Sequence, residues 1–161
     1  MPKPGFEKAA LGVLAGMAAT TLMTSAMTRL HARLPARQRY SLPPRQILGA
    51  LAGGGAFATV VMHFVFGALA GGLFPLMTRR RGAAAGATYG GAVWAVSYLG
   101  WLPASGVLRP AWRHPPLRNG LMLTAHLIWG AALAWSLREL EAAAGSAFAA
   151  NEEADMHSDD R

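Results

Sequence analysis

The chain has 161 residues, of which 53% are hydrophobic and only 14% are charged, whereas soluble domains carry about 25% charged residues. Four long stretches, at 9–28, 46–78, 82–108 and 119–137, contain no Asp, Glu, Lys or Arg, which excludes the charged helix faces of a soluble protein and predicts an integral membrane protein. The absence of cysteine excludes disulfides and thiolate chemistry, and the net charge of +7 comes largely from arginines beside the apolar stretches, which favours lipid headgroups over nucleic acid as the partner.

Residues 1–8 form a polar N-terminal lead, and the apolar run at 9–28 predicts the first membrane helix. A signal peptide is the alternative, because lysines precede the run. The run is longer than the roughly 7–15 apolar residues of a signal peptide and ends at Arg29 without an A-x-A pattern, which favours a membrane helix.

The segment that follows, 29–45, is rich in arginine and proline. The next uncharged stretch, 46–78, exceeds the roughly 20 residues that cross a bilayer. It therefore predicts a short interfacial helix at 46–53, broken by three successive glycines, and a second membrane helix at about 55–77. A single long tilted helix is the alternative.

Beyond a basic turn, the stretch at 82–102 predicts the third membrane helix and the stretch at 120–137 predicts the fourth, with a proline- and arginine-rich loop at 103–119 between them. The membrane domain therefore extends over 9–138. The remaining residues, 139–161, contain seven of the eight acidic residues, which predicts a frayed helical start followed by a disordered tail.

Two similar segments, "HFVFGALA" at 63–70 and "HLIWGAAL" at 126–133, lie in the second and fourth predicted helices, and a basic segment with two adjacent prolines precedes each. This pattern predicts an all-α integral membrane protein of four helices, built as two hairpins in a parallel internal repeat. His63 and His126 would then lie roughly 10 Å from the same side of the membrane, counting 1.5 Å per residue, and the repeat axis could bring them together.

Three roles are open for this candidate intramembrane polar site of His63 and His126. Each neutral imidazole could donate to a backbone carbonyl or a Ser/Thr hydroxyl of a neighbouring helix and so stabilise packing. An ionisable side chain within the membrane also indicates proton or ion handling. Ligation of a metal or haem is the third role, although two imidazoles alone make an incomplete metal shell.

Glycines recur at four-residue spacing along the predicted helices, a pattern that lets membrane helices approach closely. These glycines are Gly12, Gly16, Gly67, Gly71, Gly82, Gly86 and Gly90. We interpret them as packing residues within one bundle. The alternative is a dedicated homodimer interface, which would use the last three.

Arg79, Arg80 and Arg81 form the basic turn between the second and third helices and predict a topology determinant, with lipid headgroup binding as a minor addition. The two proline-rich loops carry eight arginines, and the opposite side of the membrane carries six lysines and arginines near the spans. This small excess predicts that the proline-rich loops face the cytoplasm and that both termini lie outside.

The sequence contains no HExxH, GxSxG or Walker A motif, and none of its eight acids lies in a predicted span. It therefore predicts no enzymatic activity, and it gives no ground for a cofactor.

Four stretches, "LPPRQI", "MHFVFGALAG", "AVWAVSYLGWLPA" and "AHLIWGAAL", resemble the YagU-like family of small bacterial inner-membrane proteins, over about residues 8–137. The resemblance implies an inner-membrane location and several membrane helices, and it brings no established reaction and no catalytic residue. We predict a multi-pass protein of structural or accessory role, with the bilayer as its partner. The alternatives are a small transporter or channel that uses His63 and His126, and a bis-histidine haem or metal-binding membrane protein.

Overall fold

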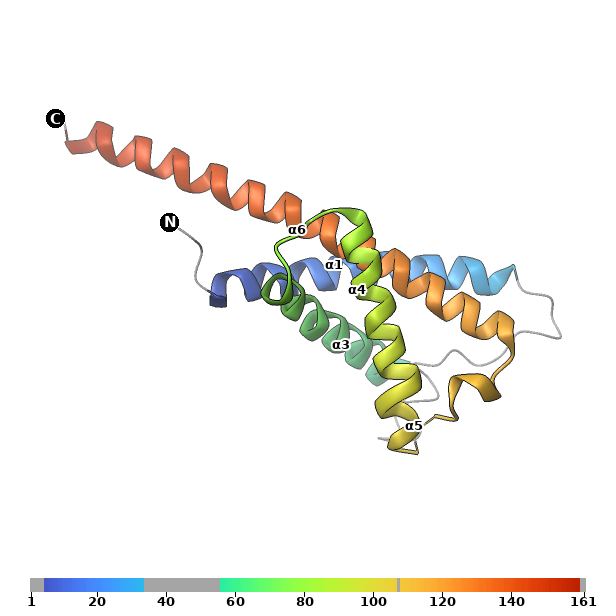
Figure 1. Ribbon diagram of the computed structural model, residues 1–161. Coiled ribbons are helices and arrows are strands. Elements are labelled where there is room, and N and C mark those ends of the chain that lie inside the picture. The colour runs from blue at the N-terminus through green and yellow to red at the C-terminus, as the bar shows by residue number, and fades with distance from the viewer. Residues whose placement is uncertain (1–4, 34–55, 107, 160–161) are drawn as a thin grey trace.

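The computed structural model describes residues 5–33, 56–106 and 108–159, and this part of the chain is all-helical, without a strand (Figure 1). Within these residues, three helical segments are long and apolar enough to cross a membrane: Gly5–Ala32, Val60–Met77 and Pro116–Ser146. The predicted interfacial helix at 46–53 lies outside the described residues.

The first two membrane helices are close to their predicted bounds. Helix α1 (Gly5–Ala32) covers 9–28 and extends it at both ends, so the polar lead is already helical from Gly5. Glu7 in its first turn and Arg29 in its last turn both complement the helix dipole, which favours this extension. Helix α3 (Ala56–Met77) matches the predicted 55–77.

The third helical segment changes its winding along its length. Helix α4 (Ala83–Ala95) continues as the π-helix η2 (Val96–Trp101) and then as the single turn α5 (Leu102–Ala104). Gly100 has a non-helical backbone (φ −106°, ψ −105°). Pro103 has no amide hydrogen and so leaves the carbonyl of residue 99 without its helical donor, which loosens the winding at this point. The predicted helix at 82–102 is therefore bent near its end.

Helix α6 (Pro116–Asp159) follows a short 3₁₀ turn, η3 (Ala111–Arg113), and has 44 residues, or about 66 Å at 1.5 Å per residue. It covers the predicted fourth helix at 120–137 and continues over the segment for which the sequence predicted a frayed helical start and then a disordered tail. The helical start agrees with "ELEAAAG" after Arg138, which is rich in strong helix formers, and the helix then extends further than the sequence predicted.

The long helices pack in two pairs, α1 with α3 and α4 with α6, and contacts between α1 and α6 join the pairs. In Figure 1, α1 and α6 run in opposite directions, α4 crosses α6, and the C-terminal part of α6 extends beyond the bundle. Each pair consists of helices that are adjacent in the chain, as in a hairpin.

Two groups of buried side chains form the interior of the bundle. One lies where α1, α3 and α6 meet, around Phe74, Trp129 and Leu133. The other lies nearer the proline-rich loop, around Tyr98 and Met122. Large apolar side chains are exposed along the outside of α3, as expected for a surface that faces lipid; they include Val61, Val65, Leu69, Leu73 and Leu76.

Candidate functional site

The crossing of α1 and α3 is formed by glycines that bring the two backbones into contact. A Cβ atom built on Gly12 would lie 2.6 Å from the carbonyl oxygen of Gly71, and one built on Gly71 would lie 2.5 Å from the carbonyl oxygen of Gly12. Gly16 lies in the same way against the carbonyl of Gly67. All four predicted packing glycines of these helices therefore lie in one contact, and any larger residue would push the helices apart.

The crossing of α4 and α6 repeats this arrangement. Gly86 lies against the carbonyl of Gly130, and Gly90 lies against the backbone carbonyl of His126. Gly82 differs, because a Cβ atom there would meet nothing within 4 Å. Gly82, Gly86 and Gly90 were the alternative homodimer interface of the sequence analysis. Two of these three glycines face α6, so they are not free to contact a second copy of the chain.

Gly130 was not among the predicted packing residues. It has no glycine four residues away on its own helix, so the four-residue spacing does not mark it. The repeated histidine segments could have indicated it, because Gly130 follows His126 at the same spacing at which Gly67 follows His63. Both of these glycines lie in helix crossings.

The two histidines come from different helix pairs, His63 from α3 and His126 from α6. The Nδ1–H of His126 donates to the carbonyl oxygen of Met122, 2.8 Å away, because a carbonyl can only accept. The Nε2 atom of His63 is buried and has no hydrogen-bond partner among the described residues.

Aromatic rings surround this pair. Tyr98 meets the His126 ring edge-on, with centroids 6.5 Å apart, and Trp94 stacks on Tyr98 with centroids 5.8 Å apart. The π-helix η2 contains Tyr98, so the altered winding of this segment sets the direction of the ring that contacts His126. On the other side, Phe64 lies edge-on to His63 at 6.4 Å.

The sequence predicted a backbone carbonyl or a Ser/Thr hydroxyl of a neighbouring helix as the partner of each histidine. His126 bonds to a backbone carbonyl of its own helix, and the hydroxyl of Thr20 has other partners. It donates to the carbonyl of Gly16 at 2.7 Å and accepts a bond from Nε1–H of Trp129 at 3.2 Å. Thr20 and Trp129 are both almost fully buried. This bond joins α1 to α6, and no sequence pattern indicates it because its partners are 109 positions apart.

A second polar contact crosses between the helix pairs. The hydroxyl of Tyr89 on α4 donates to the carbonyl of Ala70 on α3 at 2.6 Å. The Tyr89 ring also stacks on Trp129 and lies 5.1 Å from Phe74, centroid to centroid. Tyr89 therefore contacts both α3 and α6 and joins the two helix pairs.

The three arginines of the basic turn have different environments. Arg81 forms a bidentate ion pair with Glu141 of α6, with Nε–Oε2 and Nη2–Oε1 distances of 2.9 Å, and it also donates to the carbonyl of Thr78. Arg79 and Arg80 are exposed. The ion pair fixes the turn against the part of α6 that follows the predicted span.

A metal site would need more ligands than the histidine pair supplies. Among the described residues, no group of three or more His, Asp or Glu side chains lies close enough to hold a metal ion. Structural zinc sites use four protein ligands, so His63 and His126 alone would leave the coordination shell incomplete.

No family model, curated protein or solved structure matches the chain. The resemblance to the YagU-like family therefore stays a prediction. What can be inferred about function comes from the helix crossings and the histidine pair.

Proposed function

We propose that the chain is a multi-pass protein of the bacterial inner membrane with a structural or accessory role and no catalytic activity. Its four spans are α1, α3, the continuous helical segment 83–104 and α6. This segment consists of 13, 6 and 3 helical residues, a total within the range of about 17–25 residues that cross a bilayer. Together the four spans form two hairpins in a parallel internal repeat.

The observation that carries this proposal is that the bundle uses its own polar groups for packing. Thr20 bonds to Trp129, Tyr89 bonds to Ala70, and Nδ1 of His126 bonds to its own helix. Glycine contacts bring the backbones together in both hairpins. Groups that are satisfied in this way stabilise one arrangement of the helices, which is what a structural role requires.

A small transporter that carries protons is the second candidate, and the histidine pair favours it. Nε2 of His63 is buried and has no hydrogen-bond partner in the described part of the chain. An imidazole nitrogen with a free lone pair can accept a proton, and intramembrane ionisable residues commonly form proton relays.

Proton flux in liposomes separates the two candidates. The purified protein is reconstituted with a pH indicator inside, and wild type is compared with the double variant His63→Gln/His126→Gln and with His31→Gln, which changes a histidine at the end of α1. The structural role predicts that every preparation leaks protons at the rate of empty liposomes and that the double variant remains folded. Flux that rises between about pH 7.5 and 5.5, around the ordinary histidine pKa, and is lost only in the double variant would establish the transporter instead.

A further inference from the structure

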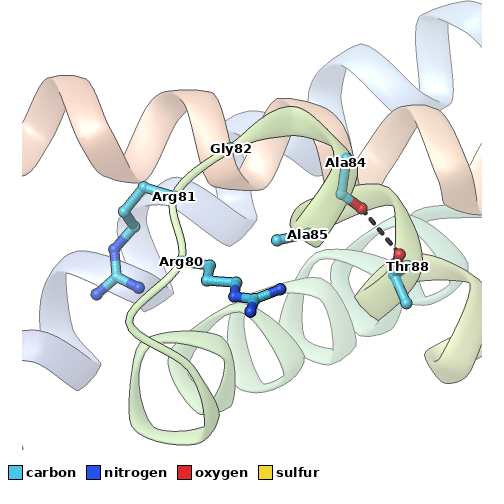
Figure 2. Close-up of a pocket in the computed structure, with 6 residues that line it drawn as sticks. All are labelled: Arg80, Arg81, Gly82, Ala84, Ala85 and Thr88. Carbon is cyan, nitrogen blue, oxygen red and sulfur yellow. Dashed lines mark hydrogen bonds between the residues drawn. The ribbon is translucent and has the colours of Figure 1, made fainter.

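A cavity of about 530 Å³ opens beside the basic turn between α3 and α4. Its lining residues are Arg80, Arg81, Gly82, Ala84, Ala85 and Thr88. This volume lies within the roughly 300–1,000 Å³ of ordinary small-molecule sites. In Figure 2, Arg80 reaches toward Ala85 on α4, whereas Arg81 points to the opposite side of the turn.

Arg80 supplies a positive charge that no described carboxylate neutralises. Glu141 is occupied by the bidentate pair with Arg81, and Glu139 pairs with Arg138. No carboxylate within the described ranges pairs with Arg80, whose backbone N–H alone is bonded, to Oγ1 of Thr78. A guanidinium in an open cavity without a counter-ion is suited to an anion, and its planar fork matches the oxygens of a phosphate.

The position of the cavity points to a lipid as the source of that phosphate. Its lining residues extend from the turn after α3 into the first turns of α4. The last turns of α3 expose the apolar side chains of Leu73 and Leu76. A charged cavity at the ends of two apolar helices lies at the depth of the headgroups, where phosphates are concentrated.

We infer that this cavity binds the phosphate group of an anionic phospholipid, with Arg80 as the cation that recognises it. Arg81 lines the cavity but is held by Glu141, so it positions the turn and contributes little free charge. The inference rests on the membrane location in the proposed function and adds a lipid preference to it. Free inorganic phosphate offers the same chemistry and is the competing source.

Native mass spectrometry of the detergent-purified protein tests this site. The protein is titrated with phosphatidylglycerol or phosphatidylcholine, and bound lipids are counted with and without millimolar inorganic phosphate. Arg80→Gln removes the proposed cation, and Arg79→Gln is its matched control, because Arg79 is exposed and carries the same charge but does not line the cavity. Ala84→Leu fills the cavity from an exposed position without changing the charge.

We expect wild type to prefer phosphatidylglycerol and Arg80→Gln to lose about tenfold in affinity, the effect of one charge-assisted hydrogen bond. Ala84→Leu should also weaken binding, and Arg79→Gln should not. Displacement of the lipid by inorganic phosphate would make free phosphate the ligand of the same site. Equal losses in both arginine variants, or no lipid preference in wild type, would overturn the inference. A chain that fails to insert into bilayers would instead refute the proposed function.

Discussion

Pro75 explains why a glycine is needed at position 12. Proline has no amide hydrogen, so Pro75 inside α3 cannot donate to the carbonyl of Gly71, four residues earlier. That carbonyl faces α1, where a Cβ on Gly12 would lie 2.6 Å from its oxygen. The Cα hydrogens of Gly12 can approach the carbonyl oxygen of Gly71, which has no helical donor, in a weak C–H···O contact. The proline and the glycine thus act as a pair across the crossing.

The same substitution at two glycines of α6 should have opposite effects. Gly130→Ala places a methyl group against the backbone of Gly86 and should destabilise the protein by about 1–3 kcal/mol or more, as overpacking does. At Gly120, nothing lies within 4 Å, so Gly120→Ala should be neutral or stabilise by up to about 1 kcal/mol through helix propensity. Unfolding of the purified variants by SDS measures both, and equal effects would refute the α4–α6 crossing.

The Thr20–Trp129 bond should contribute a measurable coupling between α1 and α6. Thr20→Val and Trp129→Phe each remove one partner and keep the apolar volume roughly in place. A double-mutant cycle on SDS unfolding should give a coupling energy of about 0.6 kcal/mol, with an upper limit near 1.7, the range of interhelical hydrogen bonds in membrane proteins. Strict additivity of the two losses would show that the bond is absent.

At the scale of elements, the uncharged stretches of the sequence predicted where the long helices lie, because a bilayer requires such stretches. They predicted the ends of α3 but not those of every helix. Arg138 marked the end of the predicted span at 120–137, yet α6 continues to Asp159, since leaving the membrane does not end a helix made of good helix formers. The bend at Gly100 was also missed, although Pro103 was its visible cause.

The loop that enters α6 should make stability depend on pH through His114. Burial lowers the pKa of His114 from 6.5, the charges of Arg118 and Arg109 lower it further, and a hydrogen bond to the carbonyl of Arg109 acts in the opposite direction. Below about pH 6.5, His114 is therefore protonated in the unfolded chain but less so in the folded loop. The free energy of unfolding should fall as the pH drops through that value. The thermal midpoint should drop more for wild type than for His114→Gln between pH 8 and 5.5. Equal drops would contradict this account.

At the scale of the whole molecule, the described helices pack as two pairs, α1 with α3 and α4 with α6, and hydrogen bonds join the pairs. The order of apolar stretches and short loops predicted that helices adjacent in the chain pack together, and the repeat of two hairpins stays a prediction. It could not predict how one pair lies on the other, since that depends on contacts such as Trp129 with Thr20 and Tyr89 with Ala70. The similarity of the two histidine segments also predicted that His63 and His126 lie close together, and this stays a prediction.

Cysteine labelling tests the four-span arrangement most directly, and the natural chain contains no cysteine to interfere. Single cysteines replace Arg33, Gly82, Ser105 and Ser146, which are all exposed. A membrane-impermeant maleimide is added to spheroplasts before and after disruption. We predict that positions 82 and 146 are labelled in intact spheroplasts and that positions 33 and 105 are labelled only after disruption; the reverse pattern would change the orientation but not the number of spans. Labelling of positions 82 and 105 from the same side would show that the segment 83–104 does not cross the membrane, and it would contradict the proposed architecture.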